Sequence, residues 1–209
     1  MSHPHKIALT LVSLFIATNA WANTATFTFD QDACSGTCGL SPFATLTLVE
    51  NGSGAGETVT VTETLRSGDR FAGTGAGEAL EFNIAGTITL TNLTSNFSFG
   101  SGAATASAFG SFSHYIDCTT CQGGQAGNPA GPISFTVGSA TGVSIASFTA
   151  NTGGFYFASD IVGSNGNTGN VAARSGVVTQ ITTTPEPGTV AMMLSGLVLT
   201  GLAARRKRG

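Results

Sequence analysis

Residues 58–65 have the sequence Thr-Val-Thr-Val-Thr-Glu-Thr-Leu, in which every second residue is threonine. Successive side chains of a β-strand point to opposite faces, so Val59, Val61 and Leu65 share one face and the threonines share the other. The pattern predicts a strand that packs its apolar face on a core and exposes its threonines to solvent.

The same alternation recurs on both sides of this stretch. Turns rich in Gly and Asn separate the segments, and no part of residues 23–181 has a sustained helical period. The expected strands are residues 24–29, 44–50, 58–65, 81–90, 96–99, 108–115, 133–137, 143–150, 155–161 and 176–182. They predict an all-β fold, an antiparallel β-sandwich or jelly-roll-like single domain over residues 23–181.

Phenylalanine is the main large apolar residue in these segments, and burying one such side chain contributes ~1.5–3 kcal/mol. We expect ten phenylalanines to be mostly core, namely Phe27, Phe29, Phe82, Phe97, Phe99, Phe112, Phe135, Phe148, Phe155 and Phe157. The alternative is an exposed aromatic platform that stacks on sugar rings.

Charge is sparse and unevenly placed. Charged residues make up 9% of the chain, against about 25% in an ordinary soluble domain. Residues 23–184 hold three basic and ten acidic side chains, a net charge of −7. An acidic region without a basic patch argues against nucleic acid and against anionic lipid as partners.

The first 22 residues have the organisation of a secretory signal peptide. A weakly positive start with His3, His5 and Lys6 precedes an apolar run at residues 7–17. Ala20-Trp21-Ala22 then supplies the small-x-small pattern that signal peptidase accepts. We expect cleavage after Ala22, with Asn23 as the mature start. A retained membrane anchor is the alternative, and it needs a longer apolar span.

Residues 182–209 form a three-part tail. Pro185-Glu186-Pro187 precedes residues 189–204, which are apolar apart from Ser, Thr and Gly. This run is predicted to be a single transmembrane helix, about one bilayer core long. The chain closes with a basic cluster, Arg205, Arg206, Lys207 and Arg208. By the positive-inside rule the cluster is a membrane stop on the cytoplasmic side, so residues 23–181 face outward.

This tail resembles the PEP-CTERM sorting signal. The resemblance implies that exosortase, a membrane transpeptidase of Gram-negative bacteria, recognises Pro185, Glu186 and Pro187. It also implies an inner-membrane intermediate, held by a transient C-terminal helix, and then transfer to the cell surface or extracellular matrix, with exopolysaccharide as an expected partner. A plain single-pass anchor is the alternative.

Three stretches nearer the middle of the chain also resemble recurring segments of PEP-CTERM surface proteins. They are Ser-Gly-Asp-Arg-Phe at 67–71 followed by Thr-Gly-Ala-Gly at 74–77, Gly110–Cys121, and Phe155–Ile161. This looser likeness brings no activity with it.

The chain has four cysteines, Cys34, Cys38, Cys118 and Cys121. Export and an even number favour disulfides, and three pairings are possible. We favour two local pairs, Cys34 with Cys38 and Cys118 with Cys121. A pairing across the two groups, a four-thiolate zinc site and a redox Cys-x-x-Cys are the alternatives.

No catalytic, cofactor or metal site emerges from the remaining residues. His114 is expected to be a strand-end residue near Cys118, because no Gly-x-Ser-x-Gly elbow accompanies it. Candidate calcium ligands (Asp30, Asp32, Asp69) lack a spaced Asp/Asn/Gly loop with a closing Glu. Candidate acids for sugar hydrolysis (Glu57, Glu63, Glu78, Glu81) are expected to be solvated.

The sequence therefore favours a non-enzymatic, exosortase-sorted component of the cell surface, extracellular matrix or biofilm. A carbohydrate-binding or adhesive module of the same architecture is the second hypothesis, and a secreted hydrolase is the third.

Overall fold

The alternating stretch quoted first forms strand β4 (Thr58–Leu65), and its burial follows the predicted phase. Val59 and Val61 are fully buried and Leu65 nearly so, whereas the threonines are half-buried or exposed. One residue breaks the expectation, because Glu63 takes the inward phase and is fully buried. Alternation dictates which way a side chain points, so a polar residue on the inward phase is buried with its neighbours.

The structure is a computed structural model that describes residues 21–74, 77–123 and 127–182. Residues Trp21–Ile181 form one compact unit. Most of the predicted signal peptide, the Pro-Glu-Pro segment, the predicted helix at 189–204 and the basic end lie outside the described residues. In the part that is described, no helix is both long and apolar enough to cross a membrane.

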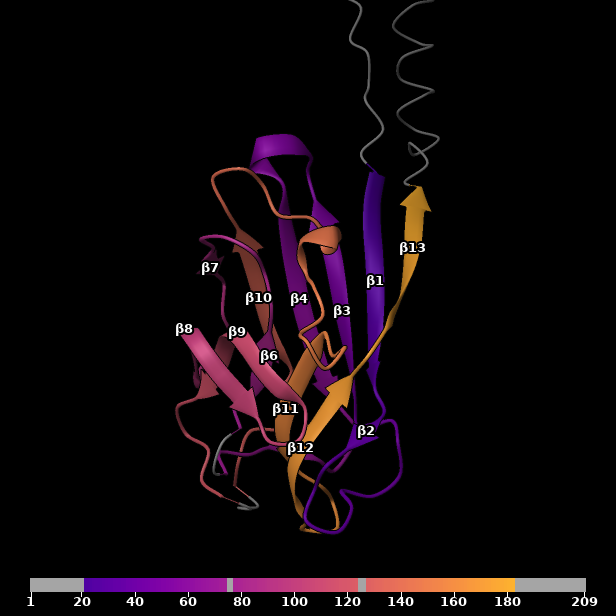
Figure 1. The fold of residues 1–209 in the computed structure, drawn as a ribbon, viewed down its shortest axis with the longest axis vertical. Coiled ribbons are helices and arrows are strands. Elements are labelled where there is room, and N and C mark those ends of the chain that lie inside the picture. Colours follow the sequence, from indigo (N-terminus) through magenta and orange to yellow (C-terminus); the bar gives the residue numbers. More distant parts are fainter. Residues whose placement is uncertain (1–20, 75–76, 124–126, 183–209) are drawn as a thin grey trace, which may run out of the picture. The chain divides into compact units, whose positions relative to one another are not determined.

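The first sheet, sheet A, has six strands in the order β13-β1-β3-β4-β10-β7 (Figure 1). Besides β4, these are β1 (Trp21–Phe29), β3 (Ala44–Asn51), β7 (Thr89–Thr91), β10 (Ile133–Gly138) and β13 (Gly176–Thr182). On the core face, Val61 lies opposite Leu48 of β3 and Phe135 of β10, both antiparallel. These apolar cross-strand pairs make the centre of sheet A.

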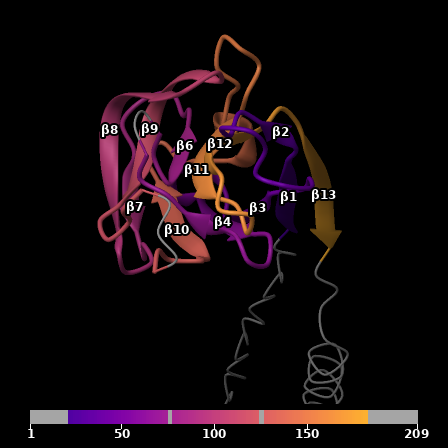
Figure 2. The same cartoon turned by 90° about the horizontal axis from the view of Figure 1, so that it is seen from below.

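The second sheet, sheet B, has the order β2-β12-β11-β6-β9-β8, with β5 paired to β11. Its strands are β2 (Gln31–Asp32), β5 (Arg70–Phe71), β6 (Leu80–Phe82), β8 (Phe97–Ala106), β9 (Gly110–Cys118), β11 (Phe157–Val162) and β12 (Thr168–Ala173). Two short 3-10 turns, η1 (Gly54–Gly56) and η2 (Ile145–Ser147), complete the described elements. The sheets lie face to face, with β8 and β9 on one side and β13 on the other (Figure 2). The predicted all-β sandwich is confirmed.

The main core fills the space between the sheets. Phe27 of β1 packs edge-on against Phe157 of β11 with ring centroids 4.8 Å apart, and Phe82 of β6 stacks on Phe135 of β10. Phe97 and Phe99 are only half-buried, at the margin of this core. The remaining expected core phenylalanines are buried, namely Phe29, Phe112, Phe148 and Phe155.

A second, smaller apolar cluster covers the other face of sheet B, which we call the outer face. Ala158 lies between Phe157 and Ser159 in β11, so it points away from the main core. It packs with Ala172 of β12 and with Phe112 and Phe155. All six residues of β11 are therefore buried, because both faces of the strand pack on apolar side chains.

The strand predictions differ most from the structure at three places. The single strand expected at 81–90 divides into β6 and β7, which belong to different sheets, because the chain turns at Gly86 with φ +88°. Residues 143–150 hold η2 instead of a strand. Strand β12 was not predicted, because Thr168-Gly-Asn resembles a turn when only the local sequence is considered.

Candidate functional site

The structure places only part of the predicted site residues. Ala20, the Pro185–Pro187 motif and the basic residues 205–208 lie outside the described range. Ala22 lies in β1, so cleavage after it would leave Asn23–Phe29 of that strand. The four cysteines are all described.

The cysteines form two local disulfides, Cys34–Cys38 and Cys118–Cys121. The Cα atoms are 5.6 Å apart in the first pair and 5.3 Å apart in the second, within the usual range. The predicted disulfides and the favoured local pairing are confirmed, with no cysteine left free. Oxidised sulfurs are not thiolate ligands, so this arrangement differs from the zinc alternative.

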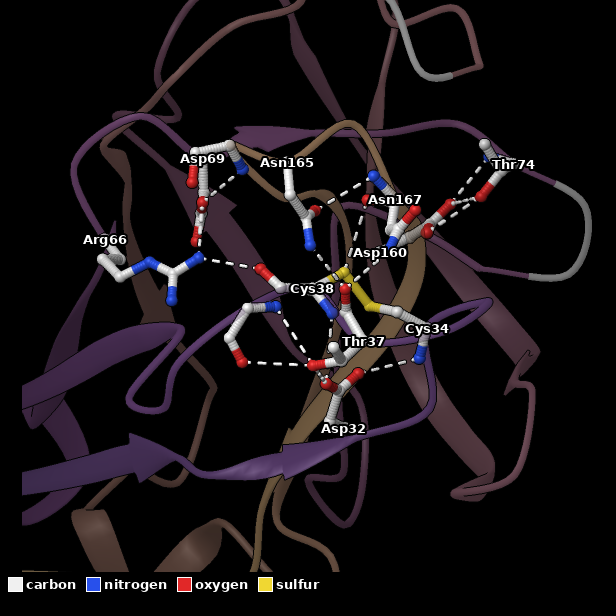
Figure 3. Close-up of a disulfide and its surroundings, with 12 residues drawn as sticks. Asp32, Cys34, Thr37, Cys38, Arg66, Asp69, Thr74, Asp160, Asn165 and Asn167 are labelled. Atoms are coloured by element: carbon white, nitrogen blue, oxygen red, sulfur yellow. Dashed lines mark hydrogen bonds and ion pairs between the residues drawn. A yellow bond between two sulfur atoms is a disulfide. The ribbon is translucent and has the colours of Figure 1, made fainter.

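Asp32 organises the first disulfide ring (Figure 3). Its Oδ1 accepts a hydrogen bond from the Cys34 backbone nitrogen at 2.9 Å. Its Oδ2 accepts from the Cys38 nitrogen at 3.1 Å and from the Thr37 hydroxyl at 2.6 Å. A carboxylate that accepts several N–H and O–H bonds is well satisfied without a cation.

The ring docks on the hairpin that joins β11 to β12. Asn165 and Asn167 each donate a side-chain hydrogen bond of 2.8 Å to the Thr37 carbonyl. A Cβ at Gly169 would lie 2.6 Å from Cys34 Cα, so only glycine allows the backbones to approach so closely. The ring therefore joins two segments that lie about 130 residues apart in sequence.

The Ser-Gly-Asp-Arg-Phe segment at 67–71 has a structural role at the same end. Asp69 is 1% exposed, and its Oδ1 accepts from Arg66 Nη2 at 2.8 Å and from the Ser164 nitrogen at 2.9 Å. Arg66 Nη2 also donates to the Cys38 carbonyl at 2.8 Å. This ion pair connects the turn after β4 to the disulfide ring and to the hairpin. Sequence reasoning missed Arg66, whose partners are distant in the chain.

His114 is in the middle of β9, so the prediction of a strand-end position is wrong. Its ring is stacked between Phe82 and Phe99 with centroids 5.7 and 5.9 Å away, and burial lowers its pKa. The Ser113 hydroxyl hydrogen-bonds to Nδ1 at 2.9 Å. Among the described residues no carboxylate hydrogen-bonds to this ring, so the third group of a triad is missing there.

The acids proposed for sugar hydrolysis divide into two environments. Glu57 and Glu78 are partly exposed, but Glu63 and Glu81 are 0% exposed, so the prediction that all four are solvated is wrong. Burial raises the pKa of Glu63 well above its ordinary value. Neither Glu63 oxygen has a hydrogen-bond partner among the described residues. The sequence contained a signal for the burial of Glu63, because this residue has the same inward phase in the alternating pattern as Val59 and Val61.

A groove of about 490 Å³ lies beside β13 and η2. Its lining includes Phe27, Phe148, Tyr156, Arg174 and Val178. The Arg174 guanidinium lies 4.1 Å from the centre of the Phe155 ring, a cation–π contact that orients it. Aromatic and cationic groups around one groove suit stacking on a sugar ring and pairing with an acidic substituent.

Comparison with protein families gives one match, the PEP-CTERM protein-sorting motif, over residues 183–208. This confirms the resemblance drawn from the Pro-Glu-Pro segment, the apolar run and the basic end. Comparison with curated proteins and comparison with solved structures found no match.

Proposed function

Because the chain carries the PEP-CTERM sorting motif and is thus an exported substrate of exosortase, we propose that its β-sandwich is a non-enzymatic component of the cell surface or extracellular matrix, associated with exopolysaccharide. The observation that carries this proposal is the match at residues 183–208. In this function Pro185, Glu186 and Pro187 are recognised by the processing enzyme, and the folded body is the cargo.

Features of the body support a structural role outside the cell. Two disulfides stabilise its loops, which suits an oxidising compartment. Hydrogen bonds between loops are made by the side chains of Asp32, Asp69 and Arg66. His114 is packed between two rings, an arrangement that suits a core residue.

Replacing both motif prolines with alanine tests the sorting step. Pro185→Ala/Pro187→Ala should accumulate as an unprocessed, membrane-bound form in a host that has exosortase, as seen by fractionation and by intact mass. The matched control is Thr183→Ala/Thr184→Ala, which changes the preceding residues and should be processed normally. Normal release of the proline variant would contradict the assignment.

Carbohydrate binding is the second candidate, and the groove beside β13 favours it. If this groove binds the host's polysaccharide, Tyr156→Ala and Arg174→Ala should each reduce saturable binding in a pull-down at least tenfold. Tyr115→Ala, which removes a half-exposed tyrosine of β9 outside the groove, is the control. Equal binding by all variants would argue against a sugar site in this groove, and the structural role would remain the proposal. Turnover of a glycan by the wild type would replace both proposals with a hydrolase.

A further inference from the structure

Glu50 is a nearly buried acid on the inward face of sheet A. It takes the same phase of β3 as Leu46 and Leu48 and is 8% exposed. In the described structure its carboxylate accepts hydrogen bonds from two neutral donors, the Asn23 side-chain amide and, at 2.8 Å, the Ile145 backbone nitrogen. A buried carboxylate that has neutral donors but no cation lacks the counter-charge that usually accompanies burial.

The basic side chains near the sandwich are engaged elsewhere. Within the described ranges Glu50 forms no ion pair with a basic side chain. Residues 23–184 contain three arginines and no lysine. Arg66 pairs with an aspartate, Arg70 donates to a backbone carbonyl at 2.7 Å, and Arg174 lies over an aromatic ring. A counter-charge for Glu50 therefore has to come from a group other than these side chains.

The strand register brings the predicted mature N-terminus next to Glu50. Antiparallel pairing of β1 with β3 sets Thr24 opposite Val49, and the next pair along this register is Asn23 and Glu50. Opposite residues in such strands have Cα atoms about 4.5–5.5 Å apart. Both side chains take the inward phase, which is why the Asn23 amide reaches the carboxylate. The backbone nitrogen of Asn23 belongs to the same residue and so lies within a few ångströms of that carboxylate.

Cleavage after Ala22, the predicted signal-peptidase site, changes the chemistry of this nitrogen. Water hydrolyses the peptide bond between Ala22 and Asn23, so the Ala22 carbonyl becomes a carboxylate and the Asn23 nitrogen becomes an α-amine. Such an amine is protonated at neutral pH, whereas the peptide nitrogen of the precursor is uncharged. The reaction thus creates a cation beside the buried acid. As the first residue of the chain, Asn23 can turn its ammonium group toward the carboxylate.

We propose that Glu50 pairs with the α-ammonium of Asn23 in the mature protein, so that removal of the signal peptide creates an ion pair that the precursor lacks. The pair holds the start of β1 to its neighbour β3. Because Glu50 also accepts from Ile145, the first residue of η2, the pair connects the new chain end to this turn. Ile145 and Phe27 line the groove beside β13, so processing stabilises one wall of that groove. The inference rests on the predicted cleavage after Ala22 and is independent of the sorting motif.

The exported chain with its tail, made in a host without exosortase and kept in mild detergent, tests the pair. N-terminal sequencing should give Asn23 first, and a different start would overturn the proposal. Without the signal peptide the chain has one lysine, Lys207. The variant Lys207→Arg leaves the α-amine as the single primary amine, so an acetylating reagent removes this charge alone. This variant is the parent chain for the measurements that follow.

Acetylation of the parent chain should lower its Tm by about 4–8 °C, because the buried carboxylate loses its partner. Glu50→Gln keeps the size of the side chain and removes its charge, so acetylation should lower the Tm of this variant by less than about 1 °C. Glu57→Gln, at a half-buried acid before β4, is the matched control and should lose as much as the parent. An unchanged Tm of the acetylated parent, or an equal loss in Glu50→Gln, would overturn the proposal.

Hydrogen exchange provides a readout that does not require the Glu50 variant to fold. Acetylation of the parent chain should speed amide exchange at least tenfold in residues 24–26 and in η2, because these are the segments that the ion pair connects. Strand β9, in sheet B, should exchange as before. Faster exchange spread evenly over both sheets, or unchanged exchange in η2, would overturn the proposal. Neither result bears on the sorting step, which the proline variants test separately.

Discussion

The Asp32 carboxylate accepts a hydrogen bond from the Cys38 backbone nitrogen at 3.1 Å, so an acid in β2 holds the far end of a disulfide ring. The same carboxylate bonds to the Cys34 nitrogen at the near end. The ring is thus held both by a covalent bond and by a charged acceptor. Because this ring also docks on the β11–β12 hairpin, its conformation affects the packing of distant segments.

Asp32→Ala should lower the free energy of unfolding by about 1–3 kcal/mol, because three hydrogen bonds to a charged acceptor are lost. Denaturant unfolding of the oxidised protein measures the loss. Asp30→Ala is the matched control, since within the described part of the chain the exposed Asp30 carboxylate accepts a single hydrogen bond, from Gln31. Its removal should change stability by less than about 0.5 kcal/mol. Equal effects of the two changes would contradict the role assigned to Asp32.

Opening either disulfide should reduce stability only moderately. Each closes a very short loop, with sequence separations of 4 and 3, for which chain entropy predicts about 2 kcal/mol. Cys34→Ser/Cys38→Ser and Cys118→Ser/Cys121→Ser should both fold and show cooperative unfolding. A protein that no longer folds after either double change would show that the ring does more than restrict the unfolded chain.

Glu63→Leu should stabilise the protein by about 1–3 kcal/mol at neutral pH, because it removes a buried carboxyl group that lacks a hydrogen-bond partner in the described structure. Equilibrium unfolding measures the gain. Thr64→Leu, at the exposed neighbouring position of β4, controls for added apolar surface and should be near neutral. Loss of stability in Glu63→Leu would mean that the Glu63 carboxyl group is needed for packing between the sheets.

Stability should fall as the pH rises from about 4.5 to about 8. The pKa values of Glu63, Glu78 and Glu81 are raised in the folded protein, to about 7 for Glu78 and about 8 for Glu81. The native state therefore keeps protons that the unfolded chain loses near pH 4.5. The resulting stabilisation is complete below that pH and is lost progressively as the pH rises to the folded pKa values. Denaturation midpoints across this range measure the slope, and Glu81→Gln should flatten it. A midpoint that rises with pH would contradict these shifts.

Much of the fold follows from short-range pattern. The alternation in residues 58–65 and 176–182 predicts β4 and β13 with their observed bounds, because period-2 spacing is a property of consecutive residues. The local disulfides were predictable for the same reason, since partners three or four residues apart are close in any compact loop. Strand β12 was missed because its small residues are buried by long-range contacts that no local window contains.

The amino-acid sequence by itself determined the exported destination and the sandwich class, because a sorting motif and an alternating period are read along the chain. Only the tertiary structure decided that Glu81 and Asp160 are buried, and which strands lie next to one another. Glu81, Asp117 and Asp160 come from three strands far apart in the sequence, and pairing across sheet B is what brings them to one face. The environment of a charged group depends on all the segments that exclude water from it, and that is a property of the folded chain.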